Sequence, residues 1–133
     1  MNKFVELIKI ADIHVNRINL AIKHTNHLFP INALKLKALT EEELAWIDLL
    51  INRFGKLQDF IGAKLIDIFL DMQEEYSNEL TMLDKINKLE KFGIIENAEL
   101  WKEMSKMRNH IAHEYPDNPE ILAFYLNQML ELI

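Results

Sequence analysis

The chain has 133 residues, a length that suits a single domain with a buried core. Half of the residues are hydrophobic and there are only three glycines and three prolines, which argues against a disordered chain and against a turn-rich β fold. The absence of cysteine excludes a disulfide framework and thiolate metal sites. We therefore expect one helical domain that spans residues 1–133.

The chain also lacks the features of a membrane or secreted protein. No apolar run approaches the ~20 residues that a membrane-spanning helix needs. The first six residues, Met1 to Glu6, do not have the design of a signal peptide. We expect a cytoplasmic protein without a membrane partner.

Charge is unevenly distributed along the chain. The net charge is −6, yet residues 1–39 hold six basic against two acidic side chains, while the remainder holds nine against nineteen. A uniformly basic nucleic-acid binder is excluded, because non-specific phosphate affinity depends on a basic surface. A local basic face on the first helix remains as a contact for RNA or an acidic partner, and a solvated helix dotted with lysines is the alternative.

Apolar residues at helical spacing predict an amphipathic helix over residues 2–26. His14, Arg17 and His24 fall on its polar side. We interpret these histidines as surface residues rather than metal ligands, since no third ligand is evident nearby. Residues 28–39 contain Pro30 and are expected to form a connection with one helical turn at Ala33 to Lys37.

The longest helix is predicted to begin after Thr40 and to run to about Glu75. Thr40 and Glu43 have the spacing of a capping box. Steps of three and four residues then define a packing seam, which consists of Leu44, Ile47, Ile51, Phe54, Gln58, Ile61, Leu65, Ile68 and Met72.

Gln58 is the one polar residue on that seam, and Gly55 and Gly62 flank it. A glycine inside a helix costs about 1 kcal/mol relative to alanine, so two of them indicate close approach by another backbone or a ligand. We favour a tightly packed, hydrogen-bonded glutamine over a direct catalytic role for Gln58.

Three further features complete the predicted fold. Thr81 is placed to cap a helix that stops at Gly93 in a left-handed conformation. The next helix starts near Asn97 and is stopped by Pro116, and Pro119 opens a last helix with a broad apolar surface. The sequence thus predicts an all-α fold, a compact up-and-down bundle of about five helices with one long central helix.

The segment from Arg108 to Tyr115 concentrates most of the potential chemistry of the chain. It reads RNHIAHEY, and it holds one of three arginines and one of three tyrosines in the sequence. On an α-helix Asn109 and His113 are four residues apart and can touch, as can His110 and Glu114. Arg108 and His113 are about 140° apart. They converge only if the arginine wraps around, the helix distorts, or a second protomer supplies the other half.

Arginine, four residues, histidine, one residue and tyrosine, with asparagine after the arginine, resembles the signature of HEPN domains, in particular of their HepT-like branch. The similarity continues in residues 53–61, RFGKLQDFI, which resemble the central helix of the family, and in residues 82–95 before the motif. Trp101 also fits. The resemblance covers most of the chain from roughly Thr40 onward.

This resemblance implies a ribonuclease toxin that works as a homodimer or higher even oligomer, with the two motifs at a dimer cleft. It also implies a partner, a nucleotidyltransferase antitoxin of the MntA type, which attaches AMP to the tyrosine that corresponds to Tyr115. Pro116 and Pro119 depart from the pattern and alter how Tyr115 is presented.

The residues themselves suffice for RNA cleavage without a metal ion or a cofactor. His113 is the candidate general base or acid. Arg108 would stabilise charge on the phosphorane, and Asn109 would orient the imidazole or the phosphate. His110, Glu114, Arg53 and Asp59 are possible supporting residues. RNA rather than DNA is the expected substrate, because the 2′-hydroxyl is the attacking group.

Two alternatives remain open at this point. Related HEPN proteins resemble non-catalytic substrate-binding subunits of small nucleotidyltransferases, and the acidic bulk charge suits such a role. A helical interaction protein without chemistry is the third hypothesis.

Overall fold

The computed structural model describes residues 3–114 and 117–132, with the side chain of Glu114 left out, and this part of the chain is helical with no strand. Its elements are α1 (Lys3–Thr25), the 3₁₀ turn η1 (Asn26–Leu28), α2 (Ala33–Lys37), α3 (Glu41–Phe60), the π-helical turn η2 (Ile61–Leu65), α4 (Ile66–Met72), α5 (Met82–Lys91), α6 (Ala98–Glu114) and α7 (Pro119–Leu132). The all-α prediction is confirmed. None of these helices is both long enough and apolar enough to cross a membrane.

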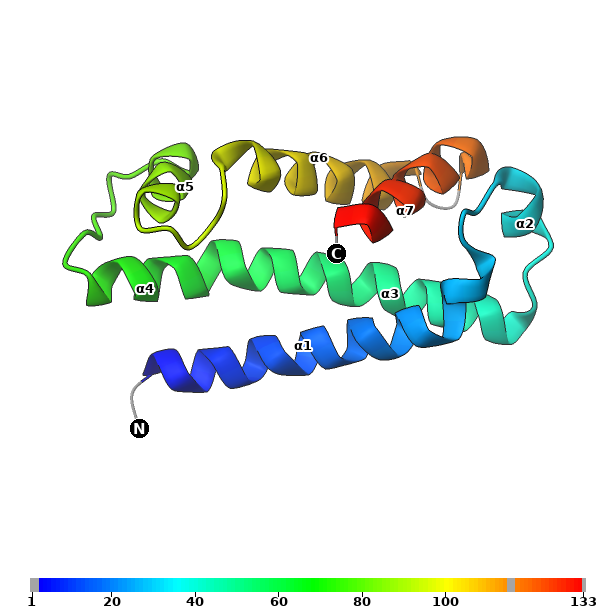
Figure 1. The fold of residues 1–133 in the computed structure, drawn as a ribbon, viewed down its shortest axis with the longest axis horizontal. Coiled ribbons are helices and arrows are strands. Elements are labelled where there is room, and N and C mark those ends of the chain that lie inside the picture. Colours follow the sequence, from blue (N-terminus) through cyan, green and yellow to red (C-terminus); the bar gives the residue numbers. More distant parts are fainter. Residues whose placement is uncertain (1–2, 115–116, 133) are drawn as a thin grey trace.

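α3, η2 and α4 form one continuous rod, and this rod is the predicted long central helix (Figure 1). α1 runs antiparallel along one side of the rod. α5, α6 and α7 cover the opposite side, and the short α2 closes the end where α1 turns into α3 (Figure 1). The arrangement places the motif helix α6 directly against the middle of the rod.

Capping boxes define where α3 and α5 begin. Thr40 accepts a hydrogen bond from the Glu43 amide while Glu43 accepts one from the Thr40 amide, so the predicted capping box is present. Thr81 and Asp84 form a second one at the start of α5. A side-chain cap contributes about 1 kcal/mol to helix stability. Gly93, with φ of +75°, follows the end of α5 as its sequence predicted.

The packing seam of the rod differs from the prediction after Gln58. Ile66 donates its amide to the Ile61 carbonyl, five residues back, which is the hydrogen bond of a π turn. This wider turn moves the buried position from the predicted Leu65 to Ile66, while Leu70, which was expected on a second apolar side of the helix, is fully buried. The predicted Met72 is half exposed instead, and the rod ends there rather than at about Glu75.

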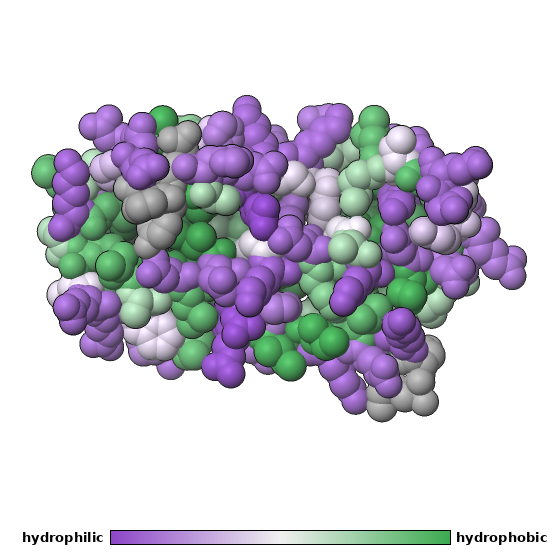
Figure 2. All heavy atoms as spheres, turned by 180° about the vertical axis from the view of Figure 1, so that it is seen from behind, coloured by the Kyte–Doolittle hydropathy of each residue, from purple (hydrophilic) through white to green (hydrophobic). Residues whose placement is uncertain are grey.

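Two apolar clusters form the core. The larger one joins α1, α3, α6 and α7 around Ile47, Leu50 and Leu126, all of which are fully buried. The smaller one joins α4 and α5 around Leu70 and Ile86. Figure 2 shows a rear surface on which hydrophilic side chains are interspersed with apolar patches.

The connection between α1 and α3 is fastened to α7 by one side chain. The Asn127 amide donates to the Ile31 carbonyl and accepts from the Ile31 amide, each at 2.8 Å. Ile31 lies in a nonhelical segment, so its backbone amide and carbonyl have no partners within a helix. The two hydrogen bonds to Asn127 supply these partners. The end of the bundle that carries α2 is therefore held against the last helix.

Candidate functional site

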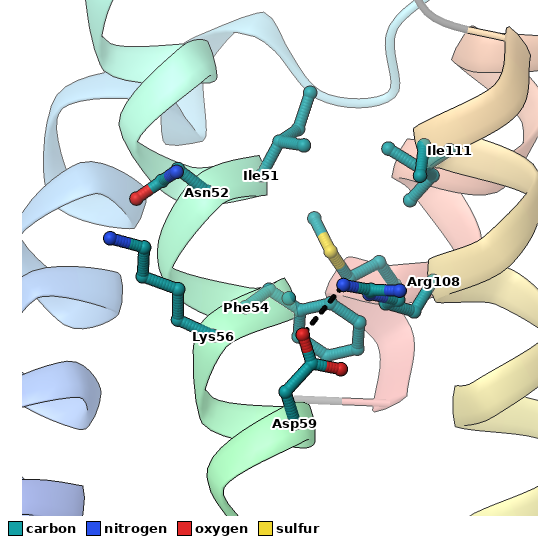
Figure 3. A pocket seen from close by; sticks show the side chains of 10 residues that line it. Ile51, Asn52, Phe54, Lys56, Asp59, Arg108 and Ile111 are labelled. Carbon is teal, nitrogen blue, oxygen red and sulfur yellow. Dashed lines mark hydrogen bonds and ion pairs between the residues drawn. The ribbon is translucent and has the colours of Figure 1, made fainter.

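Arg108 reaches from the middle of α6 to the rod. Its Nη2 donates to Asp59 Oδ2 at 2.7 Å, which forms an ion pair between α6 and α3. Figure 3 shows the two side chains pointing toward each other in the space between these helices. The pair is open to water, since 33% of the arginine side chain and 60% of the aspartate side chain are exposed.

Gly55 gives the arginine room to lie against the rod. A Cβ atom at this position would stand 3.3 Å from Arg108 Nε, closer than side chains usually pack. At Gly62 an added Cβ would lie 3.4 Å from Trp101 Cζ2, an ordinary van der Waals distance, so Trp101 packs closely on the rod there. Close approach at the two glycines was predicted, but the approaching groups are side chains of α6 rather than a backbone.

Two open hollows border Arg108, one on each side. The first hollow, of about 290 Å³, is lined among others by Asn52, Gly55, Lys56, Asp59, Ile111 and Ala112. The second hollow, of about 470 Å³, is lined among others by Gln58, Asp59, Gly62, Ala63, Trp101, Ser105 and Asn109. In the first, Lys56 and Asn52 point away from Arg108 (Figure 3). Arg108 is thus a cation that faces both hollows.

A polar pair from α3 and α6 lines the second hollow. Gln58 Nε2 donates to Ser105 Oγ at 2.7 Å, which links α3 to α6. Gln58 is only 7% exposed, and its Oε1 has no hydrogen-bond partner among the described residues. The expectation of a packed, hydrogen-bonded glutamine is met, and one buried acceptor remains open for a partner.

α6 carries Arg108 and His113 toward different surroundings. The helix is regular from Ala98 to Glu114, so it does not distort to bring the two together. His113 is exposed and lines neither the first nor the second hollow. Both routes that would join them within one chain, a distorted helix and an arginine that wraps around α6, are therefore not taken.

His110 turns toward the last helix. Its ring stacks on Tyr125 with centroids 4.5 Å apart and planes 6° from parallel. Tyr125 also meets Phe124 edge to face. His110 is half-buried in this stack, away from the hollows beside Arg108. In this stack His110 acts as a packing residue between α6 and α7.

The remaining predicted site residues divide between the two sides of the rod. Asn109 is exposed and borders the second hollow, and Asp59 borders both. Arg53 lies on the α1 side instead, where its Nη1 donates to His14 Nδ1 at 3.3 Å. The side chain of Glu114 and the whole of Tyr115 lie outside the described residues.

His14 is half-buried between α1 and α3 rather than a surface histidine, which corrects the sequence-based expectation. Burial lowers the pKa of His14, and the positive charges of Arg53 and Lys56 lower it further. His24 remains exposed, with its ring stacked on Trp46 at 4.1 Å. Neither residue belongs to the site around Arg108.

Sequence reasoning missed Ser105 and assigned Trp101 to the core or an interface. Ser105 stands one helical turn before Arg108 and Asn109, on the face that meets the rod, and this spacing was the available signal. Trp101 lines the second hollow as well as packing on the smaller cluster. Both depend on how α6 is rotated against α3, which periodicity alone does not give.

No group of three or more His, Asp or Glu side chains within the described ranges is placed to hold a metal ion. A scan against protein-family models and searches of curated proteins and solved structures found no match to the chain. Function is therefore inferred from the geometry of the site together with the sequence motif around Arg108.

Proposed function

We propose that this protein cleaves RNA without a metal ion, as the toxin of a toxin–antitoxin pair of the HepT-like HEPN type. The observation that carries the proposal is the position of Arg108, a permanent cation that faces two open hollows and pairs, among the described residues, with a solvent-exposed carboxylate. A phosphodiester that spans the two hollows can take the place of Asp59. A guanidinium binds phosphate oxygens with two parallel hydrogen bonds.

The chemistry needs one imidazole to accept a proton and another to donate one. The 2′-oxygen attacks the adjacent phosphorus as a His113 imidazole takes its proton, and a second imidazole protonates the departing 5′-oxygen. The products are a 2′,3′-cyclic phosphate and a free 5′-hydroxyl. Arg108 stabilises the charge that develops on the phosphorane, and Asn109 orients the phosphate or the imidazole.

A second copy of the chain supplies the missing imidazole in this proposal. Arg108 and His113 lie on different faces of the same regular helix, α6. A symmetric partner that contributes the second residue is therefore the remaining way to bring an arginine and a histidine into one site. The last helix offers a contact for that partner, because Ile121 and Phe124 are exposed, Phe124 at 60%. In a twofold dimer each copy would bring the same arginine and histidine to one cleft.

The proposed control is adenylylation of Tyr115 by a partner nucleotidyltransferase of the MntA type. Tyr115 follows Arg108 by seven residues, two helical turns in an α-helix. An attached AMP would add phosphate charge and bulk next to the arginine that binds the substrate. Replacing Tyr115 with phenylalanine would then abolish adenylylation while leaving RNA cleavage intact.

The second candidate is a non-catalytic substrate-binding subunit of a small nucleotidyltransferase. Two observations favour it: Asp59 already neutralises Arg108, and His113 lines neither hollow. Such a subunit would bind an anionic substrate at Arg108 and leave it unchanged.

Cleavage of RNA by purified variants tests the proposal and separates the two candidates. We expect Arg108→Ala and His113→Ala to abolish RNA degradation and to relieve growth arrest on expression. His27→Ala is the matched control, since His27 is also an exposed histidine, but it lies in the η1 turn and pairs with Glu43. If His113→Ala behaved like the wild type, the nuclease proposal would fall and the binding subunit would remain.

A further inference from the structure

The second hollow has a composition that the cleavage chemistry does not use. Neither the attack on phosphorus nor the proton transfers require Trp101, Gln58 or Ser105. Yet the indole of Trp101, the Gln58–Ser105 hydrogen bond and the exposed amide of Asn109 all border this one space. It therefore joins an aromatic ring with donors and acceptors of hydrogen bonds immediately beside the guanidinium of Arg108.

The local backbone keeps this space open. Gly62 lines it and sits in the π turn, where an added Cβ would touch Trp101 Cζ2 at 3.4 Å and Met82 Cε at 3.6 Å. π turns inside α-helices occur often at functional sites. A bulkier residue at position 62 would occupy part of the hollow and press on the indole.

A separate observation points to a ligand. The Oε1 atom of Gln58 is buried, and no hydrogen-bond partner for it is found among the residues that the structure describes. A buried carbonyl oxygen of this kind normally has a partner. The Gln58 side chain borders the hollow. A small rotation of its amide group would present a hydrogen-bond acceptor or donor to a molecule bound there.

We propose that the second hollow binds one nucleobase of single-stranded RNA, next to the phosphate that Arg108 holds. This inference takes RNA as the substrate from the proposed function. It adds a site that binds one base and so determines which position along the strand lies at Arg108. Trp101 provides the aromatic surface on which a base stacks, and the Gln58–Ser105 pair reads its polar edge. A paired base inside a duplex would not reach this space, so the site selects an unpaired nucleotide.

The first hollow provides the comparison within the same molecule. It also borders Arg108 and Asp59, and its other lining residues include Ile111, Ala112, Lys56, Phe54 and Asn52. Phe54 is only 4% exposed, so its ring belongs to the core and offers little surface for stacking. The amide in this hollow, that of Asn52, is exposed and points away from Arg108, and among the described residues no tryptophan lines the hollow (Figure 3). The two hollows therefore predict different roles on the two sides of one phosphate, with base recognition only on the Trp101 side.

Three exposed alanines make a matched set of variants. Ala63 lines the second hollow, Ala112 lines the first, and Ala45 lies far along α3 near neither. We expect Ala63→Leu to weaken binding of a short single-stranded RNA by about tenfold or more, the size of the loss of one stacked base. The same loss should follow when one nucleotide of the RNA is made abasic. Ala45→Leu should bind as the wild type does.

Tryptophan fluorescence detects the base without RNA cleavage. The chain has two tryptophans, so in a Trp46→Phe background the emission comes from Trp101 alone. We expect nucleoside 5′-monophosphates to quench this emission and ribose 5-phosphate to leave it unchanged. Ala63→Leu in the same background should remove the quenching, whereas Ala112→Leu should retain it.

The outcomes separate this inference from the proposed function. Quenching by a nucleoside monophosphate that Ala63→Leu abolishes supports the base site even if no RNA is cleaved. Equal binding of nucleoside monophosphate and ribose 5-phosphate overturns the base site, even if the wild type cleaves RNA and His113→Ala does not. Loss of RNA binding in Ala112→Leu with full binding in Ala63→Leu would overturn it too, because the base would then lie in the first hollow.

Discussion

Arg108 Nη2 and Asp59 Oδ2 lie 2.7 Å apart and join the motif helix α6 to the central rod, while water reaches both side chains. Exposed ion pairs of this kind contribute about 0–1 kcal/mol to stability. The aspartate therefore positions the guanidinium at little energetic cost and leaves it exchangeable. A phosphate that offers two oxygens can compete with one carboxylate for the same donors.

Replacing Asp59 with asparagine should strengthen RNA binding severalfold. The substitution removes the carboxylate that competes for Arg108 and also one negative charge beside the bound phosphate. The free energy of unfolding should change by less than about 1 kcal/mol, because the pair is exposed. Fluorescence anisotropy with a labelled single-stranded RNA measures the affinity, and urea denaturation measures the stability.

Glu99→Gln is the control for Asp59→Asn, since it removes one charge from an exposed pair with Lys102 at the start of α6. If both variants raised the affinity for RNA equally, the effect would come from net charge alone. The claim that Asp59 competes with phosphate for Arg108 would then be wrong.

The hydrogen bond between Gln58 and Ser105 should stabilise the fold, because it pairs a polar group that is buried. Ser105→Ala leaves the buried amide of Gln58 without its partner, which costs about 1–3 kcal/mol of unfolding free energy. Adding Gln58→Leu to that variant removes the unpaired group and should recover most of the loss. A double-mutant cycle by urea denaturation measures both terms. Additive losses would show that the two side chains do not depend on each other.

Protonation of His14 should destabilise the fold in mild acid. Its Nδ1 accepts a hydrogen bond from Arg53, which has only donors, so this nitrogen carries no proton. Burial, Arg53 and Lys56 lower the pKa of His14 from 6.5 in the folded chain. The unfolded chain then binds more protons, and the unfolding free energy falls as the pH drops from about 6.5 toward the folded-state pKa.

His14→Gln keeps an acceptor for Arg53 but removes the titration, so it should flatten this part of the pH profile. Urea denaturation at about pH 7.5 and about pH 5.5 gives the slope for each variant. His27→Gln is the exposed control. Equal slopes for the wild type and His14→Gln would assign the acid sensitivity to other groups.

The exposed surface of α7 should hold the proposed dimer together. Phe124→Glu places a charge on a side chain that is 60% exposed, so the monomer should remain folded while self-association weakens. Ile13→Glu is the matched control, since Ile13 is 53% exposed and belongs to α1, which lies on the other side of the rod from α6 (Figure 1). Analytical ultracentrifugation reports the mass, and RNA cleavage should fall together with the dimer. A Phe124→Glu variant that keeps the mass of the wild type would remove α7 from the interface.

Local sequence signals predicted the helices well. The capping box of Thr40 and Glu43, the short helix of Ala33 to Lys37 and the left-handed Gly93 depend on neighbours within a few residues. Leu70 was expected on a second apolar side of the helix, but the burial of Ile66 was not predicted, because it follows from one π turn that helical periodicity does not contain. A π turn contains one residue more than a regular helical turn, and the periodicity of apolar residues does not reveal where such a turn occurs.

The candidate site was predicted in part. The motif residues were found from their chemistry, but the partner of each depends on how α6 and α1 are rotated against α3. Asp59 therefore meets Arg108, whereas Arg53, six residues earlier on the same helix, points to His14 on the other side. Contacts between segments that lie far apart in the sequence decide this, and no local pattern encodes them.

The chemical ends of the RNA fragments test the central claim most directly. The wild type, in the presence of a metal chelator, should leave 2′,3′-cyclic phosphate and 5′-hydroxyl ends that mass spectrometry identifies. Arg108→Ala and His113→Ala should leave none, while His27→Ala should match the wild type. Fragments with 3′-hydroxyl and 5′-phosphate ends, cleavage that stops when metal is removed, or unchanged products from His113→Ala would contradict the claim that Arg108 and His113 act on one phosphodiester.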